Sequence, residues 1–210
     1  MQGVAQALRQ TGVDHVKRGR IGRPVFTGQV YHRVGLGQRR LPSAVAISAH
    51  EGQDFAVGAL TQSQHQIFAN EAIQKIAQNI KYDMSVLANY GIEIKGDIYD
   101  TMLAHYLIEP EKRHNMDAMA MSYLNYEPMS IESLIGKKGI KQGNMRDADV
   151  MAVKEYAAED ADITLQLKPI LDQKLLTNPK AITLLQEVEM PLSRVLSSIE
   201  REGVNLDIPF

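Results

Sequence analysis

The chain of 210 residues is long enough for one large domain or for a domain with an extension, and its 44% apolar and 23% charged composition is ordinary for a globular protein. Because it has no cysteine, disulfides, thiolate zinc sites and a thiol nucleophile are excluded. No apolar stretch reaches the ~18 residues of a membrane span, so we expect no membrane partner and a cytoplasmic location.

The net charge of −2 is unevenly distributed along the chain. Residues 1–70 carry 8 basic and 3 acidic side chains, whereas the remaining residues carry 15 basic and 22 acidic ones. A basic region beside an acidic one can indicate a nucleic-acid-binding arm, or two regions with different histories. The sequence leaves both readings open.

The N-terminal third has weak signals of secondary structure. Residues 1–42 are rich in Gly, Gln and Arg and show neither period clearly, with at most a short strand around 25–34. Two better strand patterns at 43–49 and 54–60 are separated by a four-residue loop, which predicts a β-hairpin. We therefore expect an atypical N-terminal segment over residues 1–66.

From residue 67 onward, short helical patterns with clear boundaries dominate. Strands are predicted at 76–80 and 92–95, and Gly91 is placed to end the helix before the second of these. Predicted helices cover residues 68–76, 82–90, 100–108, 115–124, 130–135, 149–176 and 179–202. Early strands followed by helices predict an α/β or α+β domain. Of these we expect an α/β fold with a reduced or irregular N-terminal sheet and a helix-rich C-terminal two-thirds.

The stretch Asn-Ile-Lys-Tyr-Asp ending at Asp83 lies where a predicted strand gives way to a helix. A carboxylate at such a junction is well placed to bind a metal ion. It is also a favourable helix N-terminal acid, because the helix dipole attracts negative charge there. Taken alone, this short motif favours the second interpretation.

The stretch Tyr-Ala-Ala-Glu-Asp-Ala-Asp begins at Tyr156 and lies inside a predicted helix. Tyr156 and Asp160 are four residues apart and so share one helix face, while Glu159 and Asp162 are expected to point elsewhere and to be solvated. Together with Asp83, this face suggests phosphodiester hydrolysis, which uses carboxylates to hold two divalent ions ~3.5–4 Å apart. Tyr156 would then position the attacking water.

Several motifs in the same order and spacing resemble the proofreading domain of the bacterial DNA polymerase I family, over roughly residues 67–207. They are NIKYD, the following DTMLAHYLIEP, YAAEDAD and EMPLSRVLSSIEREGVNLD. The family is a ribonuclease H-like 3′–5′ exonuclease of the DEDD class, tyrosine subtype. The last motif resembles the helix that leads to the polymerase thumb, and it favours this family over ribonuclease D.

The resemblance implies an exonuclease domain over residues 67–177, the start of the thumb helix over 178–210 and a polymerase domain that normally follows. It implies two Mg²⁺ (or Mn²⁺) ions held in part by Asp83 and Asp160, with Tyr156 at the water. The implied partner is the 3′ end of single-stranded DNA. By the same resemblance, the residues expected near the DNA are Gln78, Asn79, Tyr82 and Ile131.

The sequence departs from the family at a third motif, Asp-x-Glu, which supplies two of its four acidic ligands. Counting back from the predicted hairpin places this motif near residues 29–33, where there is no carboxylate; Asp14 is the single acid in the first 50 residues. His32 lies there, but imidazole is a poor ligand at a hard Mg²⁺ site. We therefore expect weakened metal binding and impaired hydrolysis. Because the sequence stops at Phe210, before any palm or fingers, we expect no DNA synthesis by this chain alone.

Two explanations for the missing motif stay open: a diverged strand region, or translation of a shifted reading frame. Two functions also stay open, a 3′–5′ exonuclease with residual activity and a catalytically inactive nucleic-acid-binding or structural domain. A purely helical interaction domain is the third and weakest alternative, because the motif order argues against it.

Overall fold

The computed structural model of the protein describes residues 31–32, 44–46 and 62–205. Most of the atypical segment predicted over residues 1–66 therefore lies outside the described residues. The same holds for the strand predicted at 54–60 and for the predicted hairpin as a whole.

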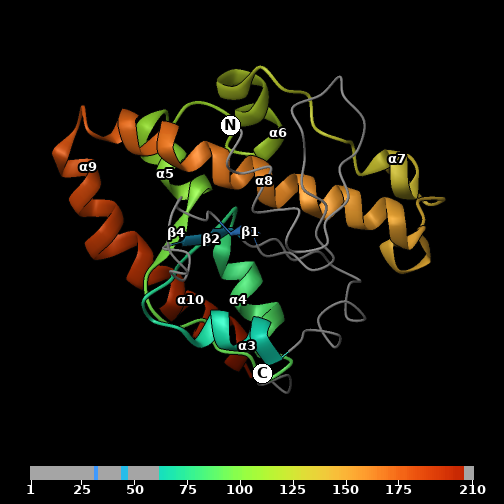
Figure 1. Ribbon diagram of the computed structural model, residues 1–210, viewed down its shortest axis with the longest axis horizontal. Helices are drawn as coiled ribbons and strands as arrows, with labels where there is room; N and C mark the ends of the chain where they lie inside the picture. Colours follow the sequence, from blue (N-terminus) through green and yellow to red (C-terminus); the bar gives the residue numbers. More distant parts are fainter. Residues whose placement is uncertain (1–30, 33–43, 47–61, 206–210) are drawn as a thin grey trace, which may run out of the picture.

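A small sheet of four strands, in the order β1-β2-β3-β4, forms the centre of the described part (Figure 1). Its strands are β1 (Tyr31–His32), β2 (Ala44–Ala46), β3 (Gln74–Ala77) and β4 (Ile98–Asp100). The first pair is antiparallel and the other two pairs are parallel, with Val45 opposite Lys75 and Ile76 opposite Tyr99. β2 confirms the strand predicted at 43–49, and the mostly parallel sheet fits an α/β fold.

Helices make up most of the remaining structure, and nearly all lie where the sequence predicts them. Two of them contain a turn of π-helix (η1 and η3), and one short 3₁₀ turn (η2) precedes the longest helix. The elements are α3 (Gln62–Ala69), α4 (Ile80–Ala88), α5 (Thr101–Ile108), α6 (Met116–Met119), η1 (Ala120–Leu124), α7 (Glu132–Ile135), η2 (Met145–Asp147), α8 (Val150–Leu175), α9 (Pro179–Leu184), η3 (Leu185–Glu189) and α10 (Met190–Glu202).

The ends of the longest helices follow ordinary capping rules. The Asp149 carboxylate accepts hydrogen bonds from the N–H groups of Met151 and Ala152, both at 3.0 Å, and so starts α8. Gly203 follows α10 with a φ of 73°, the left-handed conformation in which glycine commonly ends helices.

The helices pack on both sides of the short strands. α8 contacts β1, β2, β3 and α5, while α4 contacts β3, β4 and α10. In Figure 1, α8 runs above the strands and α4 and α10 lie below them. The core between these layers contains fully buried side chains from each, including Ile76 of β3, Ile80 of α4 and Leu167 and Leu171 of α8. Burial of this apolar surface is the main driving force that holds the layers together.

Two secondary-structure predictions are wrong and one is displaced. The helix predicted over 68–76 ends at Ala69, because the Asn70 side chain accepts the Ala72 N–H at 2.9 Å and forms a turn. The strand predicted at 76–80 is β3, displaced toward the N-terminus.

The strand predicted at 92–95 is an extended loop instead. Its backbone groups bond outside any strand ladder: the Ile92 N–H donates to the Leu87 carbonyl at 3.1 Å, and the Lys95 N–H donates to the Phe68 carbonyl at 3.0 Å. Ile92 and Ile94 are nevertheless buried, which explains the misleading alternation in the sequence. The parallel strand in this region is β4, which begins at Ile98.

The described part is thus a helix-rich α/β fold with a small, mainly parallel sheet. None of the helices within the described ranges is both long enough and apolar enough to cross a bilayer.

Candidate functional site

The first part of the candidate site is a face of α8 that carries Tyr156 and Asp160, one helical turn apart. Both side chains are buried, as are Ala157 and Ala161, whose small side chains allow close packing. The sequence predicted this pairing from the helical spacing, and α8 provides it because both residues lie within one continuous helix.

Burial and acidic neighbours both affect the pKa of Tyr156. Burial raises the pKa of the Tyr156 phenol above its ordinary value, and the nearby carboxylates of Asp160, Asp117 and Glu159 raise it further. Burial, followed by the charge of Glu159, also raises the pKa of Asp117. Tyr156 is therefore a neutral hydroxyl at physiological pH, able to donate a hydrogen bond and unsuited to act as a base.

Glu159 does not behave as the sequence suggested. It was expected to be solvated, but only 4% of it is exposed. The Tyr126 hydroxyl donates to its Oε1 atom, and the Met129 N–H donates to its Oε2 atom at 2.9 Å. Glu159 thus attaches the 126–129 loop to α8, a role that helical spacing alone could not reveal because its partners are about 30 residues away.

The second part of the candidate site is the turn from β3 into α4, which carries Asp83. Asp83 lies in the first turn of α4 and is 3% exposed, so it is far more buried than an ordinary helix N-terminal acid. Asn79 precedes the helix in a left-handed conformation with a φ of 64°. Asp83 and the Tyr156–Asp160 face come from different helices, and the convergence of Asp83 with Asp160 on a shared ion stays a prediction.

Asp100 is a buried residue of this region that the sequence reasoning missed. Its carboxylate accepts hydrogen bonds from the N–H groups of Asn79 and Ile80 at the start of α4, at 3.1 and 2.9 Å. It also accepts from the N–H groups of Met102 and Leu103 at the start of α5, at 2.9 and 3.3 Å. Burial raises the pKa of Asp100, whereas these four backbone hydrogen bonds act to lower it.

The predicted DNA-contact residue Gln78 already has internal partners. Its Nε2 atom donates to the His114 carbonyl at 2.7 Å, and its Oε1 atom accepts from the Thr101 hydroxyl at 2.5 Å. The same hydroxyl is 3.1 Å from the Ala77 carbonyl. These bonds fix the end of β3 against α5, and a DNA contact by Gln78 stays a prediction.

The His114 residue that bonds to Gln78 belongs to a network of histidines and their hydrogen-bond partners. The Nδ1 atoms of His105 and His114 are 2.7 Å apart, and the Nε2 atom of His105 is 3.4 Å from a Glu109 carboxylate oxygen. Tyr123 donates to Glu109 at 2.6 Å and Lys112 donates at 3.0 Å, which lowers the pKa of Glu109 to about 2. This network holds the chain segment that supplies the His114 carbonyl to Gln78.

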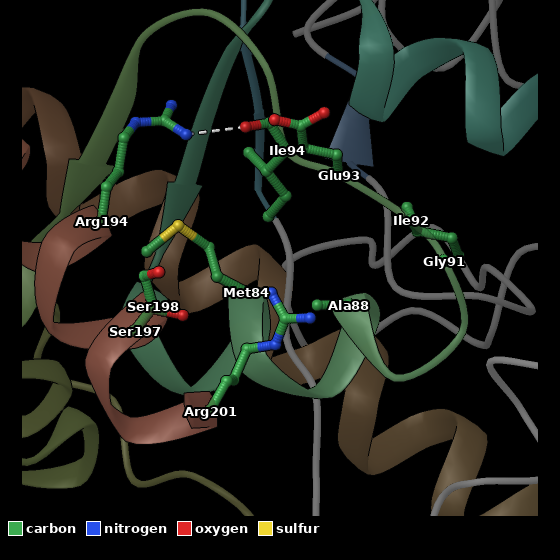
Figure 2. A pocket seen from close by; sticks show the side chains of 10 residues that line it. All are labelled: Met84, Ala88, Gly91, Ile92, Glu93, Ile94, Arg194, Ser197, Ser198 and Arg201. Atoms are coloured by element: carbon green, nitrogen blue, oxygen red, sulfur yellow. Dashed lines mark hydrogen bonds between the residues drawn. The ribbon is translucent and has the colours of Figure 1, made fainter. Parts of the chain in front are cut away.

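Helix α10 packs against α4 (Figure 2). Ser85 and Ser197 share a hydrogen bond of 3.1 Å, and Lys81 forms an ion pair with Glu200. The cavity between α4, α10 and the 91–94 loop has a volume of about 470 Å³.

The Arg194 guanidinium extends from α10 to that loop and is drawn bonded to it in Figure 2. It donates to the carbonyls of Ile94 at 2.7 Å and Gly96 at 2.5 Å. α10 therefore anchors both the helix that carries Asp83 and the loop that follows it.

The remaining predicted DNA-contact residues lie on different elements. Tyr82 is half-buried on α4, and Ile131 is 37% exposed at the start of α7. Within the described ranges there is no group of three or more His, Asp or Glu side chains that could hold a metal ion.

Comparisons with known proteins agree with this architecture. A sequence model of a 3′–5′ exonuclease family matches residues 31–176. DNA polymerase I of Pseudomonas aeruginosa is 42% identical over 136 residues, which are 63% of this chain and 15% of that protein. DNA polymerase I of Synechocystis is 30% identical over 181 residues, 84% of this chain and 18% of that protein. The chain thus spans less than a fifth of the length of these two relatives.

Solved structures give a similar result. The polymerase-domain structure of Pol1 from M. smegmatis, in complex with a DNA primer-template and dNTP, matches with a TM-score of 0.57 and 25% identity, covering 72% of this chain and 24% of that one. Brucella melitensis NrnC matches with a TM-score of 0.54 and 22% identity, covering 68% of this chain and 66% of that one. The second likeness supports the fold alone.

The family match covers well over half of the chain and includes the strands, the β3–α4 turn and the α8 face. The chain therefore belongs to the 3′–5′ exonuclease family of bacterial DNA polymerase I.

Proposed function

We propose that this chain is a 3′–5′ exonuclease domain that binds the 3′ end of single-stranded DNA in the bacterial cytoplasm and hydrolyses it weakly. The observation that carries this proposal is the buried Tyr156–Asp160 face of α8, within a region that matches the exonuclease family. A neutral Tyr156 hydroxyl beside Asp160 is suited to orient a water molecule or a phosphate oxygen.

The residues present do not fit a pair of Mg²⁺ or Mn²⁺ ions. Asp83 and Asp160 offer two carboxylates, the sequence has no Asp-x-Glu, and the described residues contain no three-membered group of metal-ligating side chains. Two carboxylates neutralise two divalent ions poorly. We infer that divalent ions bind weakly and that hydrolysis is impaired.

Recognition of the DNA end would rest on the predicted contacts at Gln78, Asn79, Tyr82 and Ile131. Ile131 is well suited, because its exposed apolar side chain can pack on an unpaired terminal base. The two polymerase relatives described above are more than five times longer than the matched segments, so we propose that this domain works beside a polymerase domain.

The experiment that tests end recognition compares two exposed isoleucines. We expect Ile131→Ala to weaken binding of a short single-stranded oligonucleotide by about 1 kcal/mol, since each apolar CH₂ group that no longer packs on a base loses about 0.8 kcal/mol. Ile140→Ala is the matched control, because Ile140 is fully exposed in the loop after α7. Fluorescence anisotropy in EDTA measures the affinity without hydrolysis, and equal effects of the two substitutions would reject the proposed contact.

The second candidate function is that of a catalytically inactive domain that binds DNA ends, and the absence of Asp-x-Glu from the sequence favours it. Its end-binding behaviour would be the same, but no metal ion would restore cleavage. The two candidates therefore separate in a hydrolysis assay with Mn²⁺ and not in a binding assay.

A further inference from the structure

We propose that Asp100 is a positioning residue for the candidate site: its carboxylate sets the first turn of α4, and with it Asp83 and Asn79, relative to β4 and α5. This inference rests on the proposed function for the meaning of the site, but its structural part can be tested independently. Asp100 is 1% exposed and does not itself need to contact DNA or metal.

The two carboxylate oxygens of Asp100 accept hydrogen bonds from different backbone groups, and this arrangement supports the role. Oδ1 accepts from Asn79, Met102 and Leu103, while Oδ2 accepts from Ile80 alone. Bonds to Met102 and Leu103 form an ordinary N-cap, since Asp100 directly precedes α5. Bonds to Asn79 and Ile80 cross to a second helix whose start lies about 20 residues earlier in the chain.

Helix α4 needs such a partner because it lacks a cap of its own. Asn79 occupies the N-cap position, but its side chain makes no capping hydrogen bond and its backbone is left-handed, with φ 64° and ψ 56°. The first N–H groups of a helix have no partner within the helix and must find acceptors elsewhere. Asp100 supplies an acceptor for the first of these groups, the Ile80 N–H, and for the Asn79 N–H just before the helix, so the direction in which α4 leaves β3 depends on it.

The bond between Asp100 and the Ile80 N–H affects the candidate site because Asp83 and Asn79 lie close to Ile80 along the chain. Asp83 lies three residues after Ile80, less than one turn away, and Asn79 is the residue before the helix. A loss of the Asp100 bond at Ile80 would loosen this turn while the buried Ile80 and Met84 side chains still hold the body of α4. Displacements of about 1 Å at a site can change its function by orders of magnitude.

The structure offers two substitutions that separate the roles of Asp100. Asp100→Asn retains one acceptor oxygen for α5 but turns an amide N–H group toward the Ile80 N–H, so that contact becomes repulsive. Asp100→Ser retains an N-cap hydroxyl for α5 but is too short to reach α4. Asp149→Asn is the control, because Asp149 caps α8 in the same way and has no bond to α4.

The test combines amide hydrogen exchange with DNA binding in the full chain. We expect Asp100→Asn to speed exchange at Ile80, and Asp100→Ser to speed exchange at both Asn79 and Ile80, at least tenfold more than at Met102 and Leu103. We also expect them to weaken binding of a 3′-ended single strand at least fivefold in EDTA, with the Asp149→Asn control unchanged. Faster exchange over the whole chain would mean a purely structural role and would overturn the proposal.

Further outcomes separate this inference from the proposed function. Unchanged exchange at Ile80, or unchanged DNA affinity despite faster exchange there, would also overturn it. If the unsubstituted chain itself does not bind the oligonucleotide, the proposed function fails. In that case exchange at Ile80 and Asn79 still decides whether Asp100 sets the start of α4.

Discussion

The two parts of the candidate site, the α8 face and the β3–α4 turn, are held in place by different kinds of interaction. On α8, helical periodicity alone brings Tyr156 and Asp160 together, and the Asp149 cap fixes where that helix starts. At the β3–α4 turn, Asp83 depends on distant groups: Asp100 bonds the first turn of α4, and α10 bonds to α4 through Ser197 and Glu200. One half of the site is therefore built locally and the other half by tertiary contacts, so the second is more easily displaced by substitutions outside the site.

The largest expected effect concerns Asp160 on the locally built half. We expect Asp160→Asn to reduce any Mn²⁺-dependent 3′–5′ cleavage by about 100-fold or more, because it removes a negative charge that would hold a divalent ion. The assay follows shortening of a 5′-labelled single strand at high protein concentration.

Asp162→Asn is the matched control for that experiment. Asp162 lies on the same helix and accepts a hydrogen bond from Gln166 at 2.8 Å, outside the Tyr156–Asp160 face. Equal cleavage by the unsubstituted protein and the Asp160 variant would show that the α8 face is not the site of chemistry.

The next effect tests whether the missing acids limit the activity. β2 is the parallel neighbour of β3, whereas β1 is one strand further away, so new carboxylates on β2 would lie nearer to the β3–α4 turn. Ala44 and Ala46 share one face of β2 because side chains alternate along a strand. We expect Ala44→Asp combined with Ala46→Glu to raise Mn²⁺-dependent cleavage by about tenfold, since added oxygen ligands strengthen binding of a hard cation.

Placing the acids at residues 31 and 33 provides the comparison for that design. Tyr31→Asp combined with Arg33→Glu installs the same motif where counting along the sequence had placed it. A larger gain from this pair than from the β2 pair would contradict the expectation that carboxylates on β2 lie nearer to the candidate site.

A smaller effect concerns the network that supports Gln78. Hydrogen bonds from Tyr123 and Lys112 lower the pKa of Glu109 from 4.5 to about 2. A carboxyl with a lowered pKa stabilises the fold above its unfolded pKa and loses that contribution as pH falls toward 2. We expect Glu109→Gln to lower the free energy of unfolding by about 1 kcal/mol at pH 7.

The pH dependence of that difference provides the check. Urea unfolding at pH 7, 4.5 and 2.5 should show the difference between Glu109→Gln and the unsubstituted protein shrinking as pH falls. A difference that stays constant with pH would mean that the charge of Glu109 contributes nothing.

The smallest effect concerns the backbone of Asn79. Its φ of 64° is left-handed, a conformation that costs a residue with a Cβ about 1 kcal/mol and glycine much less. We expect Asn79→Ala to destabilise the protein by about 1 kcal/mol more than Asn79→Gly in thermal unfolding. Identical melting temperatures for the two variants would indicate that the turn relaxes to another conformation.

The sequence predicted the parts of this molecule that depend on local rules. The helix of α8, the Tyr156–Asp160 spacing and the end of the last helix at Glu202 follow from periodicity and capping. The extended loop after α4 was misread as a strand because Ile92 and Ile94 are buried alternately, and hydrogen bonds to distant partners are invisible in a local pattern.

The sequence could not reveal the supporting residues of the site for the same reason. Asp100 and Glu159 looked like ordinary acids of helical segments, yet each accepts hydrogen bonds from groups about 20 to 30 residues away. Sequence reasoning therefore identified the candidate site residues but not the groups that hold them in place.

The measurement that tests the central claim most directly compares two single-stranded oligonucleotides of the same sequence, one linear and one circular. Fluorescence anisotropy in EDTA gives both affinities without cleavage. A domain that recognises a 3′ end binds the linear strand at least about tenfold more tightly, because a circular strand offers bases for stacking but no 3′ end to contact. Equal affinity for the two strands would contradict the account, since the domain would then bind single strands without recognising their ends.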